Sequence, residues 1–349
     1  MKELSKLKIA YWPCNHNKDV PGDRRRFFFY ASKKNVSFEI YNPSASFDIV
    51  LLSQAADIGV IENLKNNNTK VIYECNNSYH LKSYGYKDIF RGLAKYFSGN
   101  NKKLYLNYGN ALRKILSDVD GVTCASEEQA NQLSAYSDNV HCIPDMAHNE
   151  VLHVKSKYLS DEVINIAWEG LGSNAYQLNT LKTVFERFSE HHKFILHVIS
   201  DRYYYKHMNR FGRTLTESKI NKVCEHICFH NWNKQTYSKL ITECDIAIIP
   251  INHSSKIALG KPENKLILLW KMGMPTVTYS TKSYDRVMQD AGINLSCKDN
   301  DDWLGNLINL SSDAKLRQSI GRKAKNYTEE NYSEDAVLEK WDNLFQSIL

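Results

Sequence analysis

Two lysines beside a glycine are the residues of this chain best suited to holding an anion. Lys261 follows Gly260, and Lys265 comes four positions later, so on one helix both ammonium groups would project from the same face. A helix N-terminus already carries roughly half a positive charge, and cations placed there repel it unless an anion lies among them. The segment therefore predicts a phosphate-binding site. Two solvated lysines on a surface helix are the alternative.

The elements expected around these lysines suit that chemistry. Residues 246–251 form a short apolar run typical of a buried parallel strand, and a polar loop follows. Pro262 fits the first position of a helix, because its missing N–H is not needed there. We expect strand, glycine turn and helix start to form a cradle for phosphate.

A second concentration of cations lies near the N-terminus. Arg24 and Arg25 follow Gly22 in the segment VPGDRRR, after the first predicted strand. We expect a helix to begin here, which would place both arginines where a phosphate group binds. A solvated first helical turn is the competing interpretation, and the sequence leaves both open.

Four residues with metal-ligating side chains alternate along one segment: Cys224, His226, Cys228 and His230. On a strand they would share one face, but four side chains of a single extended strand span about 20 Å and cannot converge on one ion. We therefore expect no metal here, and strand packing instead.

Composition is that expected of a soluble globular protein. The 349 residues are 42% hydrophobic and 24% charged, with a net charge of +6, and lysines are spread along the chain. The eight scattered cysteines are typical of reduced thiols in a cytosolic protein. The N-terminus has neither the apolar run nor the cleavage site of a signal peptide. We expect a cytoplasmic protein, with docking on the inner face of a membrane permitted but not required.

Strand-like and helix-like segments alternate, which predicts two doubly wound α/β units. The expected strands are 8–12, 38–41, 48–53, 70–75, 121–125, 140–144, 163–169, 194–199, 226–232, 246–251 and 276–279. The expected helices are 24–34, 127–136, 178–190, 234–243 and 302 onward. Since ligands bind outside the carboxyl ends of parallel strands, the loops there should carry the site.

Several motifs, strongest from Asp118 onward, resemble those of a known family. They are VDGVTCASEEQANQL followed by VHCIPD, then WEGLGSN, DIAIIPI, GKPENKLILLWKMGMPTV and LRQSIGRKAKNYTEENYS. In order and spacing the chain is similar to retaining GT-B glycosyltransferases, family 4 in the broad sense (glycosyl transferases group 1), especially the bacterial polysaccharide branch. The resemblance implies two Rossmann-like domains facing a central cleft. These would be an acceptor-side domain at 1–155, a nucleotide-sugar domain at 156–325, and a helix at 326–349 that crosses back to the first.

The resemblance also implies roles for particular residues. Lys261 and Lys265 would stabilise the departing diphosphate without a metal, and the remaining contacts divide between donor and acceptor. The implied donor-binding residues are Glu169, Gly170, Gly260, Glu263, Asn264 and Gly22, and the implied acceptor-binding residues are Arg24, Arg25, Glu74 and His80. The family places two carboxylates seven positions apart where this chain has Lys261 and Leu268, and a leucine cannot accept hydrogen bonds from a ribose.

The implied reaction is transfer of a sugar from a nucleotide-diphosphate donor to a cell-envelope glycan or lipid-linked acceptor, with retention and with no cofactor. A catalytically inactive subunit that only binds a nucleotide sugar is the alternative, and Leu268 favours it. A nicotinamide enzyme is disfavoured because no G-x-G-x-x-G follows a first strand. A nucleic-acid partner is disfavoured because no basic tail is present.

Overall fold

A computed structural model describes residues 4–15, 20–76, 89, 93, 96–97, 102–207, 211–252 and 259–349. The chain divides into two compact units. Unit 1 comprises Met1–Met146, Gly260–Pro262 and Glu334–Leu349, and unit 2 comprises Ala147–Leu259 and Glu263–Ser333. The sequence had predicted boundaries at 155/156 and 325/326. The division instead falls after Met146, and the C-terminal segment of unit 1 begins at Glu334.

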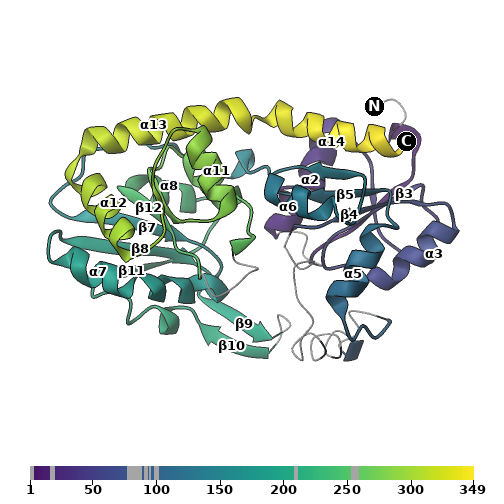
Figure 1. The fold of residues 1–349 in the computed structure, drawn as a ribbon, viewed down its shortest axis with the longest axis horizontal. Coiled ribbons are helices and arrows are strands. Elements are labelled where there is room, and N and C mark those ends of the chain that lie inside the picture. Colours follow the sequence, from purple (N-terminus) through teal and green to yellow (C-terminus); the bar gives the residue numbers. More distant parts are fainter. Residues whose placement is uncertain are drawn as a thin grey trace. The chain divides into compact units, whose positions relative to one another are not determined.

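The described part of unit 1 contains a six-stranded parallel sheet in the order β2-β1-β3-β4-β5-β6 (Figure 1). Its strands are β1 (Ile9–Trp12), β2 (Glu39–Ile40), β3 (Ile49–Leu52), β4 (Lys70–Glu74), β5 (Gly121–Cys124) and β6 (Val140–Cys142). The order 2-1-3-4 is that of flavodoxin-like sheets, in which ligands bind where the strand order reverses.

Successive side chains along these strands point to opposite faces of the sheet, so the unit has one hydrophobic core on each face. Ile9 and Tyr11 of β1 lie in a cluster with α2 (Phe27–Lys34) and α14 (Glu334–Ile348), and Figure 1 shows both helices on one face of the sheet. Ala10 lies in the opposite cluster. The helices of that second face are α3 (Ile61–Asn66), α5 (Tyr108–Leu116) and α6 (Glu127–Leu133).

The helix predicted at 24–34 is two helices. α1 (Pro21–Arg24) ends before Arg25, and α2 begins only at Phe27. Arg26 at the junction has φ −124° and ψ −117°, which is not helical. The break turns the Arg26 side chain into the interior, where it is buried, while a continuous helix would present all three arginines in succession around its surface.

The C-terminal helix α14 packs within unit 1. Asp342 accepts hydrogen bonds from the Tyr30 hydroxyl at 2.8 Å and from Lys34 Nζ at 2.7 Å. The Trp341 ring stacks on Tyr30 with centroids 5.6 Å apart and is itself buried. An apolar stripe along α14 therefore completes the core beneath α2.

Unit 2 has a six-stranded parallel sheet in the order β11-β8-β7-β12-β13-β14. Its strands are β7 (Ile164–Glu169), β8 (Phe194–Ser200), β11 (Ile227–Asn231), β12 (Ile246–Ile249), β13 (Thr276–Tyr279) and β14 (Ser296–Cys297). Read in chain order this is 3-2-1-4-5-6, the arrangement of dinucleotide-binding sheets, with the reversal between β7 and β12. A separate antiparallel hairpin, β9 (Tyr203–His207) with β10 (Phe211–Leu215), was not predicted from the sequence.

Helices cover this second sheet, and Trp270 and Trp303 are fully buried in its core. The helices are α7 (Lys182–Ser189), α8 (Tyr237–Glu243), α10 (Asn264–Lys271), α11 (Lys282–Asp290), α12 (Asn300–Ser312) and α13 (Ala314–Asn331). The predicted helix 178–190 divides into a 3-10 segment, Gly172–Leu181, and α7. Further short 3-10 helices are Leu4–Lys6, Ile58–Val60, His148–Glu150 and Glu217–Lys219.

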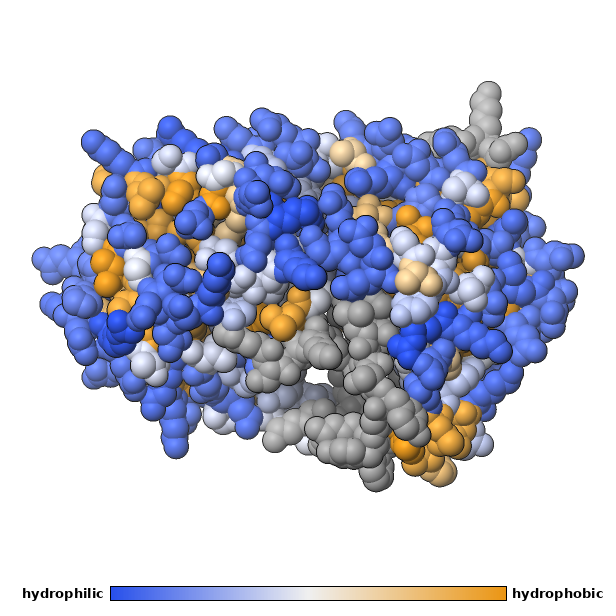
Figure 2. All heavy atoms as spheres, viewed as in Figure 1, coloured by the Kyte–Doolittle hydropathy of each residue, from blue (hydrophilic) through white to orange (hydrophobic). Residues whose placement is uncertain are grey.

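Hydrophilic residues cover most of the face drawn in Figure 2. Within the ranges that the structure describes, no helix combines the length and the apolar character needed to cross a bilayer.

Candidate functional site

Glu169 and Lys265 meet at the carboxyl edge of the unit 2 sheet. Glu169 is the last residue of β7, and Lys265 lies in the first turn of α10, the helix that follows β12 along the chain. Because β7 and β12 are the neighbours at which the strand order reverses, this is the edge where such sheets bind ligands. Lys265 Nζ donates to Glu169 Oε2, and the two side chains are 28% and 9% exposed. The pair is thus largely shielded but open on the lysine side.

A second carboxylate lies beside this pair. Asp201 follows β8, and its pKa is raised by burial and by the negative charge of Glu169, while the Gly172 N–H opposes the shift. Both glycines of the WEGLGSN segment are packed closely: a Cβ on Gly170 would come within 2.9 Å of the Trp168 ring, and one on Gly172 would collide with the Thr216 hydroxyl. Small residues therefore let this loop lie directly on the strand ends.

The two lysines do not share a helix face, and that prediction was wrong. α10 begins at Asn264 with Glu263 as its N-cap, so Lys261 and Pro262 lie before the helix, and Lys261 belongs to unit 1. The charge of Lys265 is also compensated, because Glu169 pairs with it, and Lys261 has an interaction partner within the protein. The argument from unneutralised cations at a helix start therefore does not hold. The structure instead shows Lys265 paired with Glu169 at the edge of the sheet where the strand order reverses.

Glu263 is a buried anchor for the start of α10. Its side chain is 3% exposed, and Oε1 accepts hydrogen bonds from Arg286 Nη2 at 2.9 Å and from the Tyr332 hydroxyl at 3.0 Å. Burial raises the pKa of Glu263, and the Arg286 guanidinium opposes that shift. The carboxylate thus fixes the first turn of α10, and with it Asn264 and Lys265, against α11 and the end of α13. Its position suits orientation of the site better than contact with a donor.

Leu268, at the position where the family places a carboxylate, is a core residue. It is 1% exposed and packs in the main cluster of unit 2. As a buried leucine it offers no hydrogen-bonding group to a ribose.

A buried network of charged groups occupies the corresponding edge of unit 1. Arg26 Nε donates to Glu74 Oε1 at 2.9 Å, and both side chains are fully buried. The Tyr11 hydroxyl lies 2.9 Å from Glu74 Oε2 and 2.8 Å from Asp23 Oδ1, so its one proton serves one of these carboxylates at a time. Asp23 also accepts from the Cys14 N–H at 2.7 Å.

Arg26 ties three strand ends together. Its Nη1 donates to the Ile143 carbonyl at 2.7 Å and approaches Asp145 at 3.3 Å, and its Nη2 donates to Thr123 Oγ1 at 3.1 Å. Burial raises the pKa of Glu74, Arg26 lowers it, and Asp23 adds to the rise. Through Arg26 and Tyr11 the network holds the ends of β1, β4, β5 and β6 in a fixed geometry.

These contacts revise the acceptor-side predictions. Glu74 is enclosed by Arg26 and Tyr11, so it positions those two residues and does not itself face a ligand. Gly22, which was predicted on the donor side, lies within α1, where a Cβ would come within 3.2 Å of Cys14 Sγ.

Two of the three remaining acceptor-side residues, Arg24 and Arg25, are described by the structure. Arg24 is half-buried and Arg25 buried, and both have partners within the protein. His80 lies outside the described residues.

Sequence reasoning missed Tyr11, Asp23, Arg26 and Asp201. The run DRRR did hold a signal, since three successive arginines cannot all lie on the solvent side of one helix. No such signal marks Asp201 in the sequence, because Asp201 comes close to Glu169 only when β8 pairs with β7.

No family model matches the sequence, and no curated protein sequence matches it either. Solved structures do match the fold. TarM superposes with a TM-score of 0.61 at 14% identity, over 85% of this chain and 54% of that one, so this chain spans about half the length of TarM. A glycosyltransferase from Rickettsia africae gives a TM-score of 0.60 at 13% identity, over 97% of each chain. Anabaena HepE, in complex with UDP and glucose, gives 0.62 at 8% identity, over 98% of this chain and all of that one.

The chain has the GT-B fold. This confirms the two-domain α/β architecture predicted from the sequence, with one parallel six-stranded sheet in each unit. The carboxyl edges of the two GT-B sheets carry the two clusters described here: Glu169, Lys265 and Asp201 in unit 2, and the Arg26 network in unit 1.

Proposed function

We propose that the protein is a glycosyltransferase that takes a sugar from a nucleotide-diphosphate donor bound at the carboxyl edge of unit 2. The observation that carries this proposal is the pairing of Glu169 with Lys265 at the strand reversal of a 3-2-1-4-5-6 sheet. The structures with the same fold support it: one is of a glycosyltransferase, and another holds UDP and glucose.

In this reaction the bond between the anomeric carbon and the diphosphate oxygen breaks, and an acceptor hydroxyl oxygen forms a bond to that carbon. Negative charge builds on the departing diphosphate, and Lys265 would stabilise it from the carboxyl edge of unit 2. The ammonium is shielded by its surroundings and fixed by Glu169, so little reorganisation is needed when the charge develops. The family resemblance implies the same task for Lys261, and donor contacts for Gly260 and Asn264.

Retention of configuration follows from the family resemblance. The acceptor hydroxyl would attack from the side on which the diphosphate leaves, and its proton would pass to the departing phosphate oxygen. No metal is assigned to the step, since the lysines supply the positive charge. We assign the acceptor, a glycan or lipid-linked glycan of a bacterial cell envelope, to the side of unit 1 that carries Arg24 and Arg25. TarM crystallised with α-GlcNAc-glycerol and UDP is a precedent for such a pair of ligands.

A thermal-shift panel of UDP-, GDP-, ADP- and CMP-sugars tests the donor. A donor present at a hundred times its dissociation constant stabilises the folded state by about 2.7 kcal/mol. We expect one diphosphate donor to raise the melting temperature and the CMP-sugar, with its single phosphate, to leave it unchanged. Lys265→Ala should lose the shift, and Lys239→Ala, an exposed lysine of α8, should keep it. A shift with the CMP-sugar alone, or with none of the four, contradicts the proposal.

An inactive subunit that binds a nucleotide sugar is the second candidate. Burial of Leu268 favours it, because the helix presents no carboxylate to the ribose there. The two candidates separate in one experiment: with the preferred donor, the enzyme releases the nucleoside diphosphate with or without acceptor, whereas the binding subunit shows the thermal shift and no release.

A further inference from the structure

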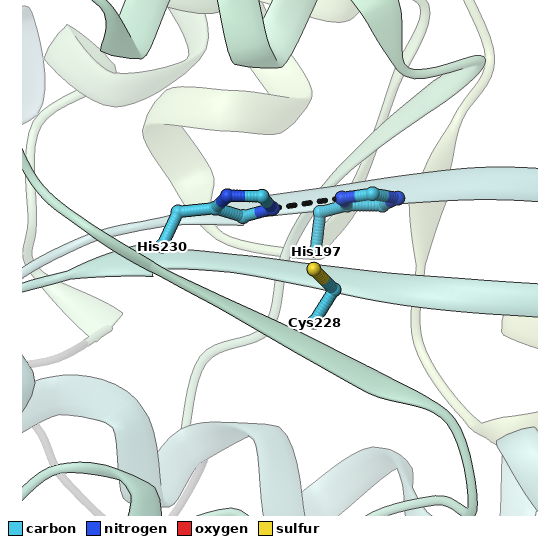
Figure 3. A group of neighbouring side chains, drawn as sticks. All are labelled: His197, Cys228 and His230. Carbon is cyan, nitrogen blue, oxygen red and sulfur yellow. Dashed lines mark hydrogen bonds between the residues drawn. The ribbon is translucent and has the colours of Figure 1, made fainter.

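Three side chains with metal-ligating chemistry converge on the edge of the unit 2 sheet. His197 belongs to β8, and Cys228 and His230 belong to the neighbouring edge strand β11 (Figure 3). Cys228 lies directly opposite His197 in the parallel register, and His230, two positions on, projects from the same face. One ligand atom from each residue lies within 4.8 Å of the other two. The single-strand argument made from the sequence did not consider His197, because strand order was not known.

The two imidazoles are already near the spacing that a shared ion imposes. His197 Nδ1 lies 3.0 Å from His230 Nε2, and two nitrogen ligands on a tetrahedral zinc lie about 3.3 Å apart. The Cys228 thiol points toward the gap between the rings in Figure 3. A small shift of the sulfur would bring all three atoms within bonding range of one ion.

Asn165 fixes the tautomer of His197 that can bind a metal through Nδ1. The side-chain amide of Asn165, on β7, donates to the Val163 carbonyl, so its oxygen accepts, and that oxygen lies 2.9 Å from His197 Nε2. His197 therefore carries its proton on Nε2 and keeps the lone pair of Nδ1 directed at His230. This is the outer hydrogen bond that metal-binding histidines make in proteins.

We propose that His197, Cys228 and His230 form a zinc site that fastens strand β11 to β8, with the fourth position open to water. Two imidazoles and one thiolate suit this borderline-soft ion. On binding, the ion displaces the His230 proton that lies between the two rings, and that proton moves to Nδ1 of His230. The Cys228 thiol releases its proton to solvent. An ion here would cross-link β11 to β8, and β11 is the last strand of the sheet in the part of the chain that the structure describes. The site is independent of donor binding.

Cobalt titration of the full, reduced, metal-free chain tests the site, because Co(II) reports thiolate ligation by a charge-transfer band and tetrahedral geometry by its visible bands. We expect one equivalent to bind with both signatures and Zn(II) to displace it. Cys228→Ser should abolish the thiolate band, and His197→Ala and His230→Ala should weaken binding at least tenfold. Asn165→Ala should weaken it about 10- to 100-fold, as loss of an outer hydrogen bond does.

Cys224→Ser and His226→Ala are matched controls from the same segment, outside the cluster, and should bind as the unaltered chain does. Metal-free melting curves of every variant establish that each is folded. The zinc-dependent rise in melting temperature should be present in the controls and absent in Cys228→Ser. The proposal is overturned if the unaltered chain gives no thiolate band, or if Cys228→Ser retains it. His197 and His230 would then be no more than a hydrogen-bonded pair.

Discussion

Replacement of Lys265 by alanine is the sharpest test of the proposed donor site, because it separates catalysis from folding. The change removes a lysine side chain that is 28% exposed and whose ammonium group pairs with Glu169, a side chain that is 9% exposed. It also leaves Glu169 beside Asp201, whose pKa is already raised by burial and by that neighbour. Both a catalytic and a structural cost are therefore expected, and their sizes differ.

The structural cost follows from the loss of one hydrogen-bonded charge pair. Leaving a nearly buried carboxylate without its cation costs about 1–3 kcal/mol of unfolding free energy. For a unit of this size that corresponds to about 2–4 °C of melting temperature per kcal/mol. The catalytic cost is set by a preorganised donor facing a developing oxyanion, and removal of such a group lowers kcat by about 10²- to 10³-fold. Turnover should thus fall far more than the loss of stability accounts for at an assay temperature where the variant is folded.

The assay is release of nucleoside diphosphate from the donor found in the thermal-shift panel, with kcat and KM determined separately. Lys239→Ala is the matched control, since Lys239 also belongs to unit 2 and pairs with an exposed glutamate, and it should change stability by less than about 0.5 kcal/mol and turnover not at all. Lys261→Ala is measured in parallel and should also lower turnover.

A double-mutant cycle with Glu169→Gln tests whether the carboxylate acts through the lysine. If it does, the double variant is no slower than Lys265→Ala alone. The reasoning is refuted if Lys265→Ala and Lys261→Ala both turn over like the unaltered chain, or if the loss of turnover merely follows the loss of folded protein.

Three further predictions concern folding. Arg26→Met leaves Glu74 buried without its cation and should cost about 3–5 kcal/mol in urea unfolding, whereas Glu74→Gln should cost less; equal costs would contradict the network. Burial lowers the pKa of Lys271 to about 8, against 10.5 in the unfolded chain, so the unfolded chain binds the proton more tightly. The free energy of unfolding should therefore rise by up to about 3 kcal/mol from pH 8 to 10.5. The rise should vanish in Lys271→Met, and an unchanged rise would refute the assignment. Trp341→Ala should destabilise unit 1 by about 3–5 kcal/mol and Lys340→Ala, an exposed neighbour, by less than about 0.5 kcal/mol; similar values from calorimetry would remove α14 from the unit 1 core.

Local pattern in the sequence was sufficient for the fold class. The apolar run 246–251 predicts a buried parallel strand, and the structure places β12 within it. This works because burial on both faces imposes hydrophobicity on every residue of a short segment, and such a requirement is visible in a few consecutive letters. Local pattern does not reveal breaks within helices. The non-helical junction at Arg26 depends on contacts of its guanidinium with distant residues such as Glu74, so 24–34 was predicted as a single helix.

Charge pairing was decided by tertiary structure alone. Lys265 was singled out from its spacing to Lys261, but its partner Glu169 stands 96 positions earlier in the chain. Arg26 and Glu74 are 48 positions apart, and His197 is 33 positions from His230. Each of these pairs depends on which strands are neighbours, and strand order follows from the packing of a whole sheet and leaves no periodic trace in the sequence. The residue types for anion and metal chemistry were thus legible in the sequence, and their groupings were not.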